Sequence, residues 1–453
     1  MNSALLEKYN VPAPRYTSYP TVPYWDATAP TAEEWKKTVN HSFHQSNDEQ
    51  GISLYIHLPF CESLCTFCGC NTRITVNHGV EMPYIMALLK EWSLYLELFE
   101  TTPRIREIHL GGGTPTFFSP LHLKELIEGI TSSSQVCEDA EFSFEAHPGN
   151  TTRAHLETLY SLGFRRISLG IQDFDQRVQE IIHRFQTYEQ VKTTVESARE
   201  IGYTSVNFDL IYGLPLQTEQ SIYHTIARVK ELAPDRIAFY SYAHVPWVKP
   251  GQRKFTEADL PVDYEKRKLY ELGRDQFKAA GYIEIGMDHF ALASDSLYRA
   301  EEKGTLHRNF MGYTHNYTRL MIGLGVSSIS DSWYGYLQNI KTVEEYERTV
   351  NKGELPIFKG HLLSKEDLIL RQHILNIICR YGTSWENPSE SCEAVLQAIP
   401  RLHEMENDKL LHLREHSLQV TPKGRAFLRN ICMAFDARLW AKAPTSQLFS
   451  TVA

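Results

Sequence analysis

The stretch SLYIHLPFCESLCTFCGC, residues 53–70, joins an apolar, β-branched run to a short loop that holds four cysteines. The run SLYIHL at 53–58 predicts a buried strand, because β-branched and aromatic residues suit a pleated surface. The cysteines follow directly, with the spacing Cys61-x3-Cys65-x2-Cys68-x-Cys70. The stretch therefore predicts a strand whose end carries a group of soft ligands.

Five more strands follow the first, each separated from the next by a segment with helical spacing. They are IREIHL (105–110), EFSFEA (141–146), RRISLGI (165–171), SVNFDLIY (205–212) and DRIAFYSYA (235–243). In the intervening segments, such as YEQVKTTVESAREIG at 188–202, apolar residues recur every three or four positions. Six strand–helix units predict an α/β fold with a parallel sheet that curls into a barrel or partial barrel.

The conspicuous residues of the chain fall where the predicted strands end. The cysteine loop follows the first strand and GGGTP (111–115) follows the second; the later ends carry Glu145, Gln172, Asp173, Asp209, Tyr242, Ala243 and His244. Active sites of parallel α/β sheets lie at the carboxyl ends of the strands. We therefore expect one active site at this rim.

The length of 453 residues predicts more than one unit, since single cores stop growing at roughly 250–300 residues. Residues 1–50 contain prolines at 12, 14, 20, 23 and 30 and lack clear periodicity, which predicts an N-terminal arm over the active site. Residues 51–360 form the predicted catalytic domain. Residues 361–453 are predicted to form a small, mostly helical C-terminal domain.

Charge and composition exclude several partners. The net charge of −9 disfavours nucleic acid and anionic lipid. The chain has neither a signal-peptide pattern nor a run of ~18 apolar residues, and its remaining cysteines show no disulfide framework. We expect a cytoplasmic protein that binds neither nucleic acid nor membrane.

The cysteine loop allows more than one metal centre on spacing alone. Clustered thiolates bind iron–sulfur clusters or zinc. A structural zinc site normally has a second cysteine pair or a histidine pair, and neither follows here, so zinc is the weaker interpretation. A catalytic CxxC redox pair would leave two of the four thiols without a role.

The CxxxCxxC spacing, the aromatic Phe67 before its last cysteine and the GGGTP loop after the second strand resemble the radical S-adenosylmethionine (SAM) family. The resemblance implies a partial (β/α)6 radical SAM barrel. It also implies one 4Fe-4S cluster on Cys61, Cys65 and Cys68, whose fourth iron binds SAM. The glycines are expected to let the backbone approach the methionyl group of SAM.

Within that family, the chain resembles the oxygen-independent coproporphyrinogen III oxidases over nearly its whole length. Segments that carry the resemblance include PRYTSYP (14–20), SLGIQDF (168–174), NFDLIYGLP (207–215) and GLGVSSIS (323–330). The resemblance implies oxidative decarboxylation of two propionates of coproporphyrinogen III to vinyl groups, by a 5'-deoxyadenosyl radical from SAM, to give protoporphyrinogen IX. It further implies haem biosynthesis, a reduced flavodoxin or ferredoxin-type electron donor and a monomer.

The resemblance also implies two SAM molecules per chain. Residues matching those around the cluster-bound SAM are Tyr55, Gly112, Glu145 and Ile329; those matching the second SAM are Phe67, Gly113, Thr114, Gln172, Arg184, Asp209 and Ala243. Cys70 lies beyond the last cluster ligand and is expected to point away from the cluster; we hypothesise that it is catalytic, in proton or hydrogen transfer. Candidate partners of the substrate carboxylates are Arg15, His289, His307 and Arg308.

Two alternatives stay open at this point. One is a radical SAM haem-binding protein or haem chaperone, and the other is a radical SAM enzyme that acts on another tetrapyrrole. The PRYTSYP arm and Cys70 favour the oxidase, because the chaperones typically lack both. The chain departs from the family pattern at His147, where aspartate is usual, and at HNYTRLM (315–321).

Overall fold

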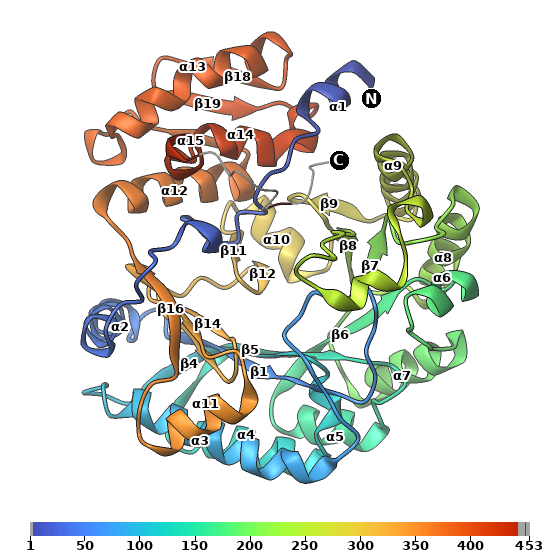
Figure 1. Ribbon diagram of the computed structural model, residues 1–453, viewed down its shortest axis with the longest axis vertical. Coiled ribbons are helices and arrows are strands. Elements are labelled where there is room, and N and C mark those ends of the chain that lie inside the picture. The colour runs from blue at the N-terminus through green and yellow to red at the C-terminus, as the bar shows by residue number, and fades with distance from the viewer. Residues whose placement is uncertain (1–2, 443–448, 450–453) are drawn as a thin grey trace.

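Six parallel strands, adjacent in chain order, form the centre of the molecule (Figure 1), which is a computed structural model describing residues 3–442 and 449. The strands are β1 (Ile52–Leu58), β4 (Arg104–Gly112), β5 (Gln135–Ala146), β6 (Phe164–Gln172), β7 (Ser205–Tyr212) and β8 (Arg236–Ser241). Each of the six predicted strands is confirmed, although β5 begins earlier than predicted.

Helices after the strands cover the outer face of this sheet (Figure 1). They are α3 (Glu81–Leu96), α4 (Pro120–Thr131), α5 (Arg153–Ser161), α6 (Gln176–Ile181), α7 (Tyr188–Ile201), α8 (Glu219–Leu232) and α9 (Asp263–Ala279). Helix α7 shows why these segments form helices and pack on the sheet. Thr187 caps its first turn, and Val191, Val195 and Ala198 form a buried stripe. The predicted partial barrel is confirmed.

The sheet continues beyond the six strands at both edges. The order is β16-β15-β14-β13-β1-β4-β5-β6-β7-β8-β10-β9, in which β13 is parallel to β1 and the outer strands are antiparallel. The added strands are β13 (Met321–Leu324), β14 (Ile329–Asp331), β15 (Gly335–Asn339), β16 (Ile357–Leu362), β10 (His289–Ala291) and β9 (Ile283–Ile285). They were not predicted, and they place Ile329 on β14, which β13 separates from the first strand.

The segment predicted as an N-terminal arm contains two helices that its lack of clear periodicity did not reveal. Helix α1 spans Ser3–Tyr9 and helix α2 spans Ala32–Ser46. Trp35, Val39 and Phe43 recur every four residues on α2 and are buried in the main hydrophobic core. This stripe has only one residue per turn and follows a proline-rich segment, so the helical spacing is hard to recognise in the sequence.

The C-terminal segment builds a second core around a small three-stranded sheet, β17-β19-β18. Its elements are α12 (Lys365–Arg380), β17 (Gly382–Ser384), α13 (Glu393–Asn407), β18 (Leu411–Arg414), β19 (Ser417–Val420), α14 (Leu428–Ala434) and α15 (Ala437–Ala441). This second core also contains Tyr16 of the arm and Leu297 of α10 (Ser296–Glu302), so it extends beyond residue 361. The three-domain division stays a prediction, and its ends at residues 1–2, 443–448 and 450–453 lie outside the described residues.

Shorter elements complete the fold. They are β2 (Phe60–Cys61), β3 (Arg73–Ile74), the hairpin β11 (His307–Asn309) and β12 (Gly312–Thr314), and α11 (Val343–Asn351). No helix among the described residues is long and apolar enough to cross a bilayer.

Candidate active site

The cysteine loop begins at β2, immediately after β1, and its first three cysteines are partly buried. Burial and the neighbouring thiols raise the pKa of Cys61 to about 11, and burial also raises the pKa of Cys65. Two polar groups face these sulfurs: Thr114 Oγ1 lies 3.4 Å from Cys61 Sγ, and Arg184 Nη1 donates to Cys65 Sγ over 3.7 Å. Grouped thiols of raised pKa need a cationic centre to become thiolates.

The donor set of this loop fits an iron–sulfur cluster. A zinc ion would hold its sulfurs within roughly 4 Å of one another, because each Zn–S bond is ~2.3 Å long. No three His, Cys, Asp or Glu side chains in the part of the chain that the structure describes are grouped to hold one metal ion. The ligands of a cluster bind different irons and lie farther apart. Three partly buried thiols on one loop, with Arg184 beside them, suit such a centre.

Cys70 lies close to Cys68, the last of the three predicted cluster ligands. Its backbone N–H donates to Cys68 Sγ over 3.4 Å, and the pKa of Cys68 is lowered to about 6 by the hydrogen-bonded Cys70. Lys249 Nζ in turn donates to the Cys70 carbonyl over 3.1 Å. The residue is exposed, and its thiol is near enough to Glu145 for that charge to raise the Cys70 pKa further.

The glycines at the end of β4 have a packing reason within the protein itself. A Cβ on Gly113 would lie 2.6 Å from the carbonyl of Pro59, and one on Gly112 would lie 2.8 Å from the His57 ring, with φ at +115°. A Cβ on Gly111 would lie 3.0 Å from the Tyr55 ring. Side chains here would therefore push the cysteine loop away from the strand that supports it.

Glu145 lies at the end of β5 and faces the barrel interior with Tyr55. Burial opposes ionisation of Glu145, but hydrogen bonds from His109 Nε2 at 3.5 Å and Gly112 N at 3.3 Å lower its pKa. The Tyr55 ring stacks on His109, and its hydroxyl lies 3.1 Å from His57 Nδ1. The result is a carboxylate held ready to accept hydrogen bonds from an ammonium group.

A second carboxylate stands on β7 in the same interior. Asp209 accepts hydrogen bonds from Ser168 Oγ at 2.8 Å and Asn207 Nδ2 at 2.9 Å. Burial and then the charge of Glu145 raise its pKa, although these donors oppose the shift. Two neighbouring carboxylates that repel one another favour a cation or hydroxyl donor between them.

Gln172 and Arg184 meet at the end of β6. The guanidinium of Arg184 donates to the Gly170 carbonyl and also to Cys65, so it links the strand end to the cysteine loop. Gln172 adopts a left-handed φ of +67°, which turns the chain out of the strand.

Phe67 and Ala243 are joined by a residue that the sequence interpretation missed. Gln252 is 1% exposed and donates through Nε2 to the Phe67 carbonyl at 3.1 Å and the Ala243 carbonyl at 3.3 Å. Its Oε1 accepts from Val245 N at 2.6 Å. One glutamine thus connects the cysteine loop to the segment after β8. A lone glutamine in a loop carries no sequence signal for this role.

The remaining predicted residues are only partly brought together. His289 Nδ1 lies 2.6 Å from Asp288 Oδ1, and the buried Arg308 lies near the same carboxylate, at 4.0 Å. Arg15 donates to the Ser241 carbonyl at 2.7 Å. His307 instead lines a separate cavity with Tyr317 and Trp333, among other residues.

Ile329, a predicted site residue, and His147, a departure from the family pattern, each contact neighbouring backbone. Ile329 begins β14, and the Gly323 of β13 packs against its backbone. At the departure from the family pattern, His147 Nδ1 accepts from Gly149 N at 3.0 Å. Burial and then the charge of Arg184 lower the pKa of His147 to about 3, so this side chain is neutral where the family usually has a carboxylate.

The chain is similar to known proteins over almost its entire length. Residues 55–229 match the radical SAM superfamily model. The oxygen-independent coproporphyrinogen III oxidase of Helicobacter pylori (strain ATCC 700392 / 26695) is 39% identical over 438 residues, 95% of each chain. That of Escherichia coli (strain K12) is 38% identical over 455 residues, 99% of this chain and 98% of its relative.

A solved structure agrees as well. It is that of coproporphyrinogen III oxidase from Escherichia coli, described as a radical SAM enzyme, and it superposes with a TM-score of 0.89 at 36% identity. The match covers 96% of this chain and 98% of that one. The chain therefore belongs to the oxygen-independent coproporphyrinogen III oxidase family of radical SAM enzymes.

Proposed function

We propose that this protein converts coproporphyrinogen III to protoporphyrinogen IX without oxygen, by oxidative decarboxylation of two propionates. The observation that carries the proposal is a cysteine loop at the carboxyl end of β1 whose Cys70 lies close enough to Glu145 to interact with its charge, with a second carboxylate, Asp209, close to Glu145. In each round a propionate loses CO2, one hydrogen atom and one electron and becomes a vinyl group. Two propionates require two rounds.

The cofactors of the family are a 4Fe-4S cluster and SAM. When bound, they supply the one-electron chemistry that removes a hydrogen atom from the propionate carbon next to the ring. Cys61, Cys65 and Cys68 would hold three irons of the cluster. The charge of Arg184 next to Cys65 favours the thiolate form of these ligands.

We propose that two SAM molecules bind per chain. Glu145, with Tyr55, Gly112 and Ile329, would hold the amino acid part of the first. Asp209, with Phe67, Gly113, Thr114, Gln172, Arg184 and Ala243, would hold the second. The presence of two separate carboxylates, Glu145 and Asp209, supports this division, because each can bind one ammonium or ribose hydroxyl.

Cys70 is proposed to transfer a proton or hydrogen near the substrate. Two electrostatic interactions support a position at the barrel interior. The Cys70 thiol raises the pKa of Tyr55, and the charge of Glu145 raises the pKa of Cys70. The exposed face of the residue leaves it open to a bound molecule.

The electron donor is proposed to be a reduced flavodoxin or ferredoxin. Such proteins are acidic, and cations and exposed apolar side chains lie around the cysteine loop. Lys249 contacts the loop itself, Leu64 is 43% exposed, and Trp247 and Val248 are 51% and 63% exposed. This surface suits a transient contact. We further propose that the enzyme works as a monomer in the cytoplasm.

One experiment separates the proposed function from its alternatives. Reduced, cluster-loaded protein is incubated anaerobically with SAM and coproporphyrinogen III, and porphyrins and methionine are measured. Vinyl product with methionine supports the proposal. Methionine without vinyl product would point to another tetrapyrrole, and tight haem binding with neither product would point to a carrier. Cys61→Ser is the matched inactive control.

A further inference from the structure

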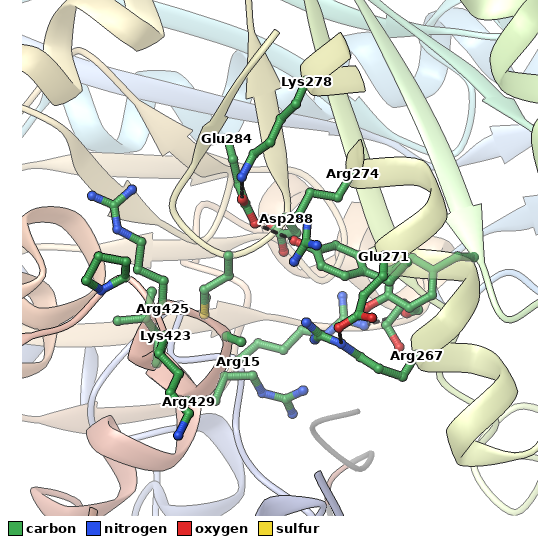
Figure 2. A pocket seen from close by; sticks show the side chains of 17 residues that line it. Arg15, Arg267, Glu271, Arg274, Lys278, Glu284, Asp288, Lys423, Arg425 and Arg429 are labelled. Carbon is green, nitrogen blue, oxygen red and sulfur yellow. Dashed lines mark hydrogen bonds and ion pairs between the residues drawn. The ribbon is translucent and has the colours of Figure 1, made fainter. Parts of the chain in front are cut away.

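A cavity of about 680 Å³ lies outside the barrel, between α9, the arm at Arg15 and the C-terminal segment 422–429 (Figure 2). On the sheet side it is bounded by Tyr212 and Ser241, which are paired neighbours at the ends of β7 and β8. Tyr212 is three residues from Asp209, and successive side chains of a strand alternate between faces. The Tyr212 side chain that bounds the cavity therefore points to the opposite face of the sheet from Asp209.

The lining of this cavity is strongly basic in an acidic protein. Seven basic and three acidic side chains line it, whereas the whole chain has a net charge of −9. Figure 2 shows them around the cavity, on the arm, α9, the β9–β10 hairpin and the C-terminal segment. The basic side chains are Arg15, Arg267, Arg274, Lys278, Lys423, Arg425 and Arg429. A concentration of cations in a concave site attracts anions.

The three acidic side chains already have partners. Glu284 accepts from Lys278 and Tyr270, at 2.6 and 2.7 Å, and Asp288 contacts His289 at 2.6 Å. Glu271 contacts Nε of Arg267 at 3.2 Å. The positive charge of the lining is therefore only partly balanced within the cavity.

Arg267 shows a specific unused donor. The residue is 9% exposed, and its Nη2 has no hydrogen-bond partner among the described residues. An unsatisfied buried donor is unfavourable, and the guanidinium of arginine suits a carboxylate in particular. Repulsion acts nearby as well, because burial and then the charge of Arg15 lower the pKa of Arg429 to about 10. An anion in the cavity would relieve this repulsion.

The rest of the lining indicates what kind of anion fits. Tyr212, Tyr270, Met287, Ala426 and Leu428 contribute ring and apolar surface. A small inorganic anion would leave this surface unused. An organic molecule with several carboxylates would use both parts of the lining, and the volume lies in the usual range for ligand sites, about 300–1,000 Å³.

We propose that this cavity binds an organic polycarboxylate outside the catalytic barrel. The enzyme's own tetracarboxylate substrate and dicarboxylate product belong to this class, and this identification of the source rests on the proposed function. A bound polycarboxylate bridges α9, the arm and the C-terminal segment. Because Arg15 also donates to Ser241 at the end of β8, occupancy of the cavity fixes the arm beside the active site.

The test uses reconstituted, full-length enzyme and coproporphyrin III, the oxidised tetracarboxylate, which is not turned over. Hydrogen exchange should slow in residues 263–279 and 422–429 when coproporphyrin III is added. Arg267→Gln should weaken the binding that causes this protection by about tenfold or more. Arg228→Gln, which removes an exposed cation on α8, should not change it.

Three outcomes would overturn the proposal. One is protection confined to the barrel interior; another is equal protection by tripolyphosphate or by the neutral coproporphyrin tetramethyl ester. The third is unchanged binding in both Arg267→Gln and Arg274→Gln. The exchange measurement on the unaltered enzyme does not depend on a variant that folds. Turnover of coproporphyrinogen III is measured separately, so a failure of the proposed function is distinguished from a failure of this site.

Discussion

Gln252 offers a direct test of how the cysteine loop is joined to the rim of the barrel. Its side chain makes three hydrogen bonds, with the carbonyls of Phe67 and Ala243 and with the N–H of Val245. Gln252→Leu keeps a similar volume and removes all three. At about 1 kcal/mol for each bond, the connection weakens by about 3 kcal/mol, which is roughly a hundredfold change in the opening equilibrium.

This change should affect binding of the second SAM more than global stability. Phe67 and Ala243 belong to the proposed second SAM site, and neither is a cluster ligand. We expect faster hydrogen exchange in residues 243–252, an unchanged iron content and a SAM stoichiometry that falls from two to one in calorimetric titrations at concentrations saturating the unaltered enzyme.

Gln176→Leu removes an exposed glutamine that donates only to Glu180, at 2.9 Å, and should behave like the unaltered enzyme. If Gln252→Leu binds two SAM molecules with unaltered affinity, the role given to this glutamine is wrong.

Four other substitutions test separate parts of the structure. Cys61→Ser should lose the cluster and its visible absorption, whereas Cys70→Ser should keep the iron and lose turnover; full activity of Cys70→Ser would refute a catalytic role. Gly113→Ala should destabilise the protein by about 1–3 kcal/mol in denaturant titrations, because its Cβ would lie 2.6 Å from Pro59, and an unchanged midpoint would contradict this packing. Burial raises the pKa of Glu91 to about 7, so its stabilising contribution is complete below about pH 4.5 and is lost as the pH rises through 7. Relative to Glu91→Gln, the unaltered protein should therefore lose about 3 kcal/mol of unfolding free energy between pH 4 and pH 8, and a pH-independent difference would count against the shift.

The central strands and the cysteine loop were predictable because each carries a strong local signal. Strand β7 has apolar residues at alternating positions of SVNFDLIY, where Val206, Phe208 and Leu210 are buried, and a capped amphipathic helix follows it. Four cysteines in ten residues have few interpretations. These signals were enough to predict one active site at the carboxyl ends of the strands.

The outer strands were not predictable because they carry no strong local signal. Strands β9, β10 and β14 are three residues long, too short to show a period, and their pairing depends on neighbours far away in the chain. Helix α2 has a core stripe of only one residue per turn. Its place in the fold follows from tertiary packing against the sheet.

The polar framework of the site was missed because single polar residues carry no local signal. His109 supports Glu145, Ser168 supports Asp209, and Gln252 joins two loops, and each acts across a long sequence separation. The basic cavity is the extreme example, since Arg15 and Arg429 are separated by nearly the entire chain and meet only in the folded protein.

Mössbauer spectroscopy of iron-57-loaded enzyme, with and without SAM, tests the central claim most directly. If Cys61, Cys65 and Cys68 alone anchor a four-iron cluster, one iron site should become distinct from the other three when SAM binds. Four equivalent irons that ignore SAM, or a centre that contains zinc, would contradict the proposed site and the decarboxylation chemistry that depends on it.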